Sequence, residues 1–174
     1  GETCILIDVE TGKVLYEQGA REPMEPASIT KIMTAILALE KGELGDTLTI
    51  SSIPPSVEGS SIYLKEGEDL TLEQMLYGMM LNSGNDAATA LAEHIGGGSI
   101  PAFVQMMNDK ARIIGAEDTN YVNPTGLIDE GHLTTAHDLA LIARYAILNL
   151  PKFREIVSTK TMEIPWEAMN ANRK

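Results

Sequence analysis

The stretch EPASITKIMTAILALEKG, residues 25–42, decides how this chain folds. Its apolar residues recur on almost every side of a helix, a pattern that is typical of a helix buried nearly all round. These residues are Ile29, Ile32, Met33, Ile36, Leu37 and Leu39. Gly42 follows them in the position of a C-cap glycine. We therefore expect a central helix here, and its first turn carries two residues that are costly to bury, Ser28 and Lys31.

Ser28 and Lys31 stand three residues apart, so their side chains share one face of a helix. A serine hydroxyl becomes a good nucleophile when a neighbouring base removes its proton. Burial disfavours the charged ammonium and lowers the pKa of a lysine, which makes Lys31 a candidate base. Unpaired N–H groups at a helix start would also stabilise an oxyanion at Ser28. A plainer alternative stays open, in which Ser28 is an N-cap and Lys31 extends to the surface along its own stem.

Outward from this helix, the sequence predicts short strands and further helices. A hairpin of residues 3–9 and 13–17 turns at Gly12, and Cys4 in its first strand is expected to be a small core residue. Thr71 and Gln74 have the spacing of a capping box. The remaining predicted elements are a two-stranded excursion over 46–50 and 61–70, helices over 71–82, 86–95, 99–115 and 135–150, and a short helix followed by a strand over 151–166.

Composition limits the class of function. The chain has 174 residues, of which 44% are hydrophobic, enough for one domain with a sizeable core. A formal net charge of −12 argues against nucleic acid as a partner, because binding phosphates needs clustered Lys and Arg. The single cysteine excludes an internal disulfide framework, and no apolar run is long enough to span a bilayer.

A second group of polar residues lies in NSGN, residues 82–85, between two predicted helices. We expect Gly84 to permit the bend and to place Ser83 and Asn85 in a tight loop. Either polar side chain could simply cap the following helix. Capping accounts for the turn, but it does not account for the turn's pairing with an upstream serine and lysine.

Ser28-x-x-Lys31 followed by Ser83-Gly84-Asn85 resembles the serine D-alanyl-D-alanine carboxypeptidases, the low-molecular-mass penicillin-binding proteins. The surrounding stretches PASITKIMTA, LTLEQMLYGMMLNSGNDAATALAEHIGG and NPTGL are similar to that family too, so the likeness covers essentially the whole chain. The resemblance implies an α/β (α+β) penicillin-recognising fold, with a helical lobe packed on an antiparallel sheet. Residues 1–174 would be the N-terminal part of a DD-peptidase-like domain, with the N-terminal hairpin and the helical lobe.

The resemblance also implies roles for the four residues. Ser28 would be the acyl-forming nucleophile and Lys31 its base. Ser83 would relay a proton to the leaving D-alanine amine, and Asn85 would hydrogen-bond the substrate amide. The implied partners are peptidoglycan stem peptides ending in D-Ala-D-Ala and β-lactam antibiotics, with no cofactor or metal. The implied location is extracytoplasmic, with membrane contact only through a C-terminal anchor outside these residues.

The chain departs from the family pattern at the third motif, K-T-G. Lys160-Thr161 is followed by Met162 in place of glycine, so we expect the motif and its strand to lie beyond Lys174. A non-catalytic protein that binds the cell wall on the same scaffold therefore remains an alternative. A class A β-lactamase is a second alternative, but it needs a glutamate after the second motif. Glu117 is the nearest candidate, and Asn120 stands at the wrong offset from it.

The histidines offer two weaker hypotheses. His137 and Asp138 could form a triad with a serine, although nothing in the sequence places Ser28 beside them. Metal binding by Asp129, His132 and His137 is disfavoured because their spacing matches no common site. We expect Asp138 instead to join Thr135 in capping a helix.

Overall fold

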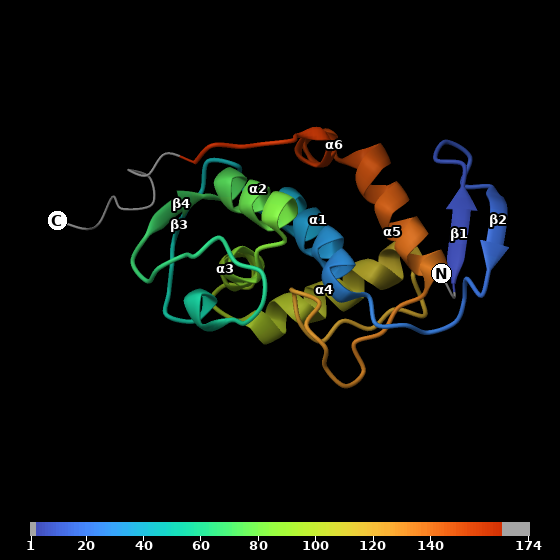
Figure 1. Cartoon of the computed structure of the whole chain (residues 1–174), viewed down its shortest axis with the longest axis horizontal. Coiled ribbons are helices and arrows are strands. Elements are labelled where there is room, and N and C mark those ends of the chain that lie inside the picture. The colour runs from blue at the N-terminus through green and yellow to red at the C-terminus, as the bar shows by residue number, and fades with distance from the viewer. Residues whose placement is uncertain (1–2, 165–174) are drawn as a thin grey trace.

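A computed structural model describes residues 3–164. Its elements are β1 (Cys4–Ile7), β2 (Val14–Gln18), the 3-10 turn η1 (Ala27–Thr30), α1 (Lys31–Lys41), β3 (Thr47–Thr49), η2 (Pro54–Ser56), β4 (Asp69–Thr71), α2 (Leu72–Asn82), α3 (Asn85–Ile95), α4 (Ile100–Ile114), α5 (Ala136–Asn149) and α6 (Pro151–Ser158). The order follows the sequence prediction, with the long helices gathered into one lobe and the β1–β2 hairpin at its end (Figure 1).

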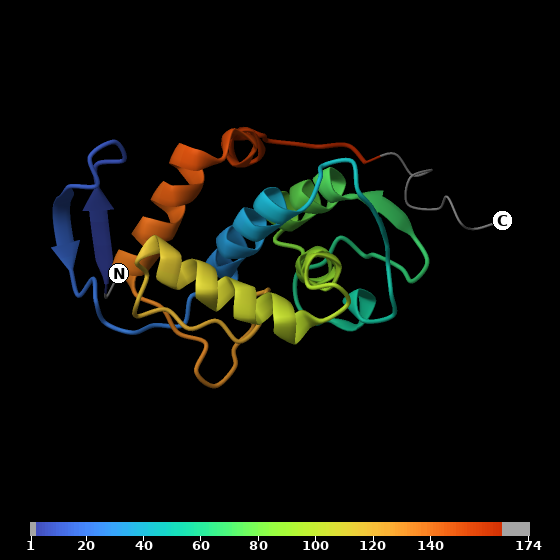
Figure 2. The ribbon, with the colours of Figure 1, turned by 180° about the vertical axis from the view of Figure 1, so that it is seen from behind.

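Helix α1 is the centre of the lobe. It packs against α2, α3, α4, α5 and α6, and both views of the ribbon show it enclosed between them (Figures 1 and 2). Its side chains from Met33 to Ala38 are all buried. The prediction of a helix buried nearly all round is confirmed, and its reason is that an apolar surface on every side must be covered on every side.

The hairpin packs through β1 onto α5. Strands β1 and β2 are antiparallel, and Gly12 takes the positive φ of +74° that the turn requires. Half-buried Ile5 and Ile7 alternate along β1 with exposed Cys4 and Leu6. The prediction that Cys4 belongs to the core is therefore wrong, because a two-stranded sheet covered on one side leaves alternate residues exposed.

The second small sheet lies at the other end of the lobe and leads into α2. Leu48 of β3 and Leu70 of β4 are paired across the strands, and both are buried. The capping box is present: Gln74 N–H donates to Thr71 Oγ1, and Thr71 N–H donates to Gln74 Oε1. These bonds satisfy two of the free donors at the start of α2 and fix where the helix begins.

Other predicted helix ends are also confirmed. Ser99 caps α4, which ends at Gly115 with φ of +91°, and Thr135 caps α5 by accepting from Asp138 N–H. Gly42 ends α1 in an extended conformation rather than a left-handed one, with φ of −109°. A side chain at Gly42 would overlap Leu72, so the glycine is explained by packing against α2.

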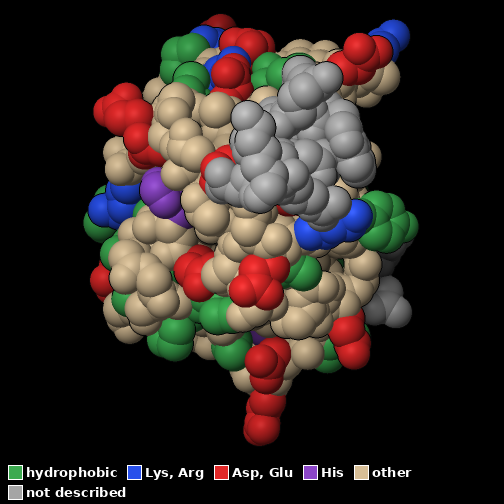
Figure 3. Space-filling view, turned by 90° about the vertical axis from the view of Figure 1, so that its left-hand side faces the viewer, with side chains coloured by type: hydrophobic (Ala, Val, Ile, Leu, Met, Phe, Trp, Pro, Cys, Tyr) green, Lys and Arg blue, Asp and Glu red, His purple; other side chains and the backbone are tan. Residues whose placement is uncertain are grey.

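The last described residues contain the predicted short helix, α6, which is followed by residues 159–164 outside any helix or strand. The predicted strand is therefore not found there, and residues 165–166 lie outside the described range. Within residues 3–164, no helix combines the length and the apolar character needed to cross a membrane. Acidic side chains are scattered over the face in Figure 3, and few basic ones lie between them.

Candidate active site

Ser28 lies in η1, which runs directly into α1 at Lys31. The sequence placed Ser28 within the helix itself, but residues three apart share one face in a 3-10 turn as well. Ala27, the residue before Ser28, has φ of +48°. The left-handed region costs a residue with a side chain about 1–2 kcal/mol. Strain of this kind persists only where surrounding contacts impose it, and it gathers at functional sites.

Lys31 is buried with only 2% of its surface exposed. Its Nζ donates to Ser28 Oγ at 3.2 Å and to the Thr125 carbonyl at 2.7 Å. Burial lowers the pKa of Lys31 from 10.5 to about 8. At pH 7 about one amine in ten is therefore neutral. A neutral amine at this distance can accept the Ser28 proton, which is the geometry that an activated serine requires.

Ser83 is the C-cap of α2 and adopts a left-handed conformation, with φ of +55°. Its hydroxyl is buried and has no hydrogen-bond partner among the described residues. Gly84, which was expected to permit the bend, does not do so through a positive φ, since its φ is −59°. Its small size suits the crowded turn, because a side chain there would come within 3.0 Å of Asp86 Oδ1 and 3.2 Å of the Gly78 carbonyl.

One hollow of about 290 Å³ brings three of the predicted site residues together. Ser28 and Lys31 line it from η1 and α1, and Ser83 lines it from the end of α2. Its other walls are apolar: Ile29, Ile32, Met79 and Met80. Ser28, Lys31 and Ser83 thus line a single hollow whose other lining residues are nonpolar.

Asn85, the fourth predicted residue, begins α3 and does not line that hollow. Its Nδ2 donates to the Glu58 carbonyl at 2.6 Å, and its backbone N–H donates to the Ser60 carbonyl at 2.7 Å. These bonds fix the side-chain amide beside the 58–60 loop. Gly59 lies so close that a side chain there would come within 2.6 Å of the amide nitrogen.

The loop over 119–134 contacts α1 next to the hollow through hydrogen bonds that the sequence did not predict. The Pro124 and Thr125 carbonyls accept hydrogen bonds from Thr34 Oγ1 and Lys31 Nζ, at 2.8 and 2.7 Å. Asn123 Oδ1 folds the turn by accepting from the N–H groups of Thr125 and Gly126. A backbone carbonyl can belong to any residue type, so its role leaves no trace in the sequence apart from the turn-forming NPTG.

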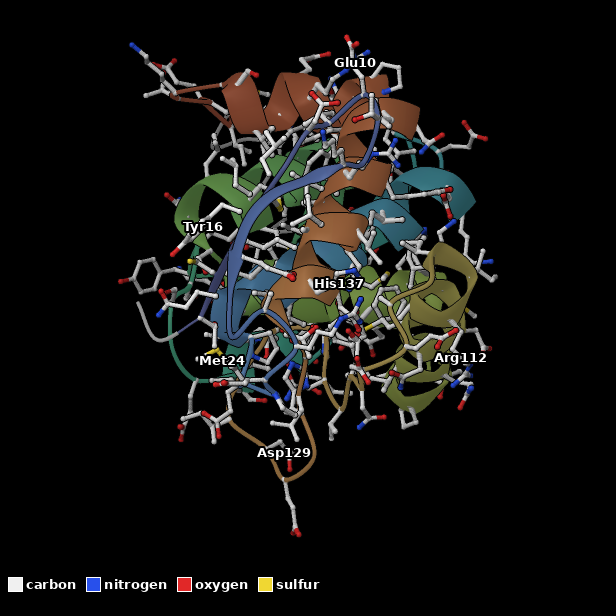
Figure 4. All side chains as sticks on the ribbon, turned by 90° about the vertical axis from the view of Figure 1, so that its right-hand side faces the viewer. Glu10, Tyr16, Met24, Arg112, Asp129 and His137 are labelled. Atoms are coloured by element: carbon white, nitrogen blue, oxygen red, sulfur yellow. The ribbon has the colours of Figure 1, made fainter. Side chains whose placement is uncertain are left out.

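The alternative sites are not assembled. His137 contacts Arg21 and Asp138, and the Asp138 carboxylate accepts from the Asp118 N–H, so neither side chain forms a triad with Ser28. Asp129 lies on the projecting loop, well apart from His137 on α5 (Figure 4). No group of three possible metal ligands occurs within residues 3–164. Glu117 is exposed after α4, and it does not line the hollow.

The lowered pKa of Lys31 predicts a pH-dependent stability. Between pH 8 and 10.5 the unfolded chain keeps a proton that the folded chain has released, so stability rises with pH in this window. The gain should approach about 3 kcal/mol. Urea unfolding of the wild type and of Lys31→Met at several pH values isolates this contribution. The other titrating groups are common to both proteins, so they cancel in the difference between the two free energies of unfolding. An unchanging difference would contradict the assigned pKa.

Comparisons with known proteins agree with this geometry. Residues 1–174 match the family model described as D-alanyl-D-alanine carboxypeptidase. D-alanyl-D-alanine carboxypeptidase DacF of Bacillus subtilis is 45% identical over 148 residues, which make up 82% of this chain and 38% of that protein. DacA of Escherichia coli is 36% identical over 170 residues, which cover 91% of this chain and 42% of that protein.

Solved structures show the same fold. The D-alanyl-D-alanine carboxypeptidase of Mycobacterium tuberculosis superimposes with a TM-score of 0.89 at 36% identity, covering 94% of this chain and 62% of that one. Penicillin binding protein 5 of Haemophilus influenzae gives a TM-score of 0.88 at 32% identity, covering 94% and 49%. The α+β fold of penicillin-binding proteins is confirmed, and the chain spans about two fifths of the curated relatives it matches. The chain belongs to the D-alanyl-D-alanine carboxypeptidase family.

Proposed function

We propose that the full-length protein is a serine DD-carboxypeptidase. It removes the terminal D-alanine from peptidoglycan stem peptides ending in D-Ala-D-Ala, through an acyl-enzyme on Ser28, and penicillins acylate the same serine. The observation that supports this most directly is the Lys31 amine, buried 3.2 Å from Ser28 Oγ with its pKa lowered to about 8. A buried amine with a lowered pKa can act as a base. A lysine that packs only its stem against the core keeps its amine in water, where the amine stays charged.

The chemistry divides between these groups. Neutral Lys31 accepts the Ser28 proton while Oγ forms a bond to the carbonyl carbon of the penultimate D-alanine. The peptide C–N bond then breaks, and the departing amine takes the proton held by Lys31 through the Ser83 hydroxyl. Water next attacks the ester, which releases the shortened peptide and restores the serine. Each proton transfer needs a donor or acceptor of matched pKa within hydrogen-bond reach.

Ser83 suits the relay because its hydroxyl is buried, unpartnered and on the same hollow as Lys31. A buried hydroxyl without a partner is unfavourable in the free protein, and a substrate amine would relieve it. Asn85 is proposed to hold the substrate amide, since one hydrogen bond to Glu58 leaves its Oδ1 and second N–H available.

The chain's place in the whole protein is also a proposal. Residues 1–174 would form the N-terminal part of the catalytic domain, and later residues would supply a K-T-G strand that walls the site. The proposed substrate, the peptidoglycan stem peptide, lies outside the cytoplasmic membrane, so we infer an extracytoplasmic location in the bacterial envelope. Any membrane contact would come from an anchor outside these residues.

Labelling the full-length gene product with a fluorescent penicillin tests the proposal. We expect a long-lived adduct that peptide mapping places on Ser28 and that Ser28→Ala lacks. A folded full-length protein that stays unlabelled would favour the non-catalytic wall-binding alternative. Rapid turnover of the penicillin would favour a β-lactamase instead.

Replacing Ser83 by alanine should slow penicillin acylation by about 10²-fold, because the proton relay to the β-lactam nitrogen is lost. Stopped-flow labelling of the full-length protein measures this rate. Ser83→Ala removes only an unpartnered hydroxyl, so the urea midpoint should hardly change. Ser56→Ala is a matched control, because that exposed hydroxyl donates to the Ile53 carbonyl and does not line the hollow. A wild-type rate in Ser83→Ala would remove Ser83 from the mechanism.

A further inference from the structure

We propose that His132 is a positioning residue for Lys31. As a neutral imidazole it ties the 119–134 loop to Thr30, and it thereby holds the Thr125 carbonyl against the Lys31 amine. The inference rests on the proposed function for its catalytic consequence, and on the hydrogen bonds of the loop for its geometry.

The two hydrogen bonds of His132 define its tautomer. Val122 N–H donates to Nδ1 at 2.9 Å, so Nδ1 carries no proton. In the neutral ring the proton is then on Nε2, which lies 2.8 Å from Thr30 Oγ1 and donates to it. His132 is 1% exposed and Thr30 is 0% exposed, so water does not compete for either bond. The ring therefore links the loop to η1 by one bond at each end.

This link closes a circuit around the candidate base. Thr30 immediately precedes Lys31 in the chain, and Val122 stands three residues before Thr125 in the loop. The circuit runs from Thr30 through His132 to the loop, and it returns from the Thr125 carbonyl to Lys31 Nζ at 2.7 Å. With both bonds made, the carbonyl cannot drift from the amine without breaking a buried hydrogen bond.

The orientation of the amine is what the circuit controls. A neutral amine has two N–H groups and one lone pair. If one N–H is committed to the Thr125 carbonyl, the amine can no longer rotate freely, and its lone pair can be held toward Ser28 Oγ at 3.2 Å. Proton transfer requires this alignment, and a displacement of about 1 Å can cost about 10²-fold in rate.

The environment of the ring keeps it neutral. Burial lowers the pKa of His132, while the charges of Asp129 and Glu25 oppose that effect. Tyr121 packs its ring edge-on at 5.7 Å, and burial raises the pKa of its hydroxyl, so it adds no charge. The group of η1 that contacts the ring is the uncharged Thr30 hydroxyl. The first residue of α1, Lys31, follows Thr30 in the chain and carries the next charged group on that side. A protonated ring would turn Nδ1 into a donor facing the Val122 N–H, and the bond that fixes the ring to Val122 would be lost.

Variants that separate the two bonds test the proposal. His132→Phe keeps the ring volume against Tyr121 and loses both bonds. Thr30→Val loses only the Thr30 bond, and Thr30→Ser restores the hydroxyl. His94→Ala is the control histidine, because His94 pairs with Asp46 on the surface of α3 and does not line the hollow.

Two readouts are measured in the full-length protein: the pKa of Lys31 by 15N NMR of labelled lysine, and the pH profile of penicillin acylation. In His132→Phe and Thr30→Val, we expect water to reach the amine. Its pKa should rise from about 8 toward 10.5, and acylation at pH 7 should fall about 10²-fold. Thr30→Ser and His94→Ala should match the wild type. If the bond between His132 and Thr30 only stabilised the loop, the variants that lack it would show a lower urea midpoint and an unchanged pKa of Lys31.

The proposal is overturned if folded Thr30→Val keeps both the wild-type pKa of Lys31 and the wild-type rate. The Thr30 pair decides the question even if His132→Phe does not fold. If penicillin fails to label the wild type, the proposed function fails, but the NMR titration still shows whether His132 sets the environment of Lys31.

Discussion

Replacing Lys31 by alanine is expected to lower the rate of penicillin acylation of the full-length protein by about 10³-fold, while the chain still folds. The variant loses the only amine that donates to Ser28 Oγ within residues 3–164, so the serine must react without a base. The buried apolar side chains of α1 and α2 pack into the core without help from the amine, so the fold should be kept. Stopped-flow fluorescence with a labelled penicillin gives the rate constant directly.

The pH profile separates a base from a structural cation. The wild-type rate should rise with pH and level off above about 8, because only the neutral amine accepts the serine proton. Lys31→Arg keeps a cation that cannot lose its proton, so it should be as slow as the alanine variant. Lys41→Ala changes an exposed lysine at the other end of α1 and should keep the wild-type profile. A wild-type rate in Lys31→Arg would show that Lys31 is not the base.

The parts of the fold that sequence could predict are those set by local rules. The apolar residues of α1 leave no face for solvent, so its central position followed from its own pattern. The caps at Thr71, Ser99 and Thr135 each satisfy N–H groups of the same helix, and their spacing shows this directly. Ser28 and Lys31 could be paired for the same reason, since three residues along a helical turn fix their separation.

The parts that were missed depend on contacts distant in sequence. Cys4 looked like a core residue because its strand is apolar, but which face of a hairpin is covered depends on α5, more than a hundred residues later. In the turn between α2 and α3, the residue with the left-handed conformation is Ser83 rather than Gly84. Close contacts with Asp86 and the Gly78 carbonyl disfavour a side chain at Gly84. The Thr125 carbonyl is invisible in sequence because every residue has one.

Replacing Gly126 by alanine should have the largest effect of any single methyl group near the site. Gly126 has φ of +87°, and a side chain there would overlap the Ala27 carbonyl and come within 3.0 Å of Ser28 N. The left-handed backbone costs alanine about 1–2 kcal/mol, and relieving the overlap costs about 1–3 kcal/mol more. Either the 119–134 loop withdraws from η1 or Ala27 and Ser28 shift. Withdrawal of the loop takes the Thr125 carbonyl away from the Lys31 amine, and a shift of Ser28 takes its Oγ away from the same amine. Either movement disturbs the alignment of the two groups, so acylation should fall by about 10²-fold.

Gly131→Ala is the matched control, because Gly131 lies in the same loop with φ of +81°. A side chain there meets only the Asn120 amide at 3.7 Å, so the variant suffers the backbone strain without the overlap. Urea unfolding should show a loss of about 1–2 kcal/mol in Gly131→Ala and roughly twice that in Gly126→Ala. Only Gly126→Ala should acylate slowly. The expectation is contradicted if the two variants lose equal stability and both acylate at the wild-type rate. In that case the 119–134 loop does not hold η1 in place, and the geometry around Ser28 must be set by α1 and α2 alone.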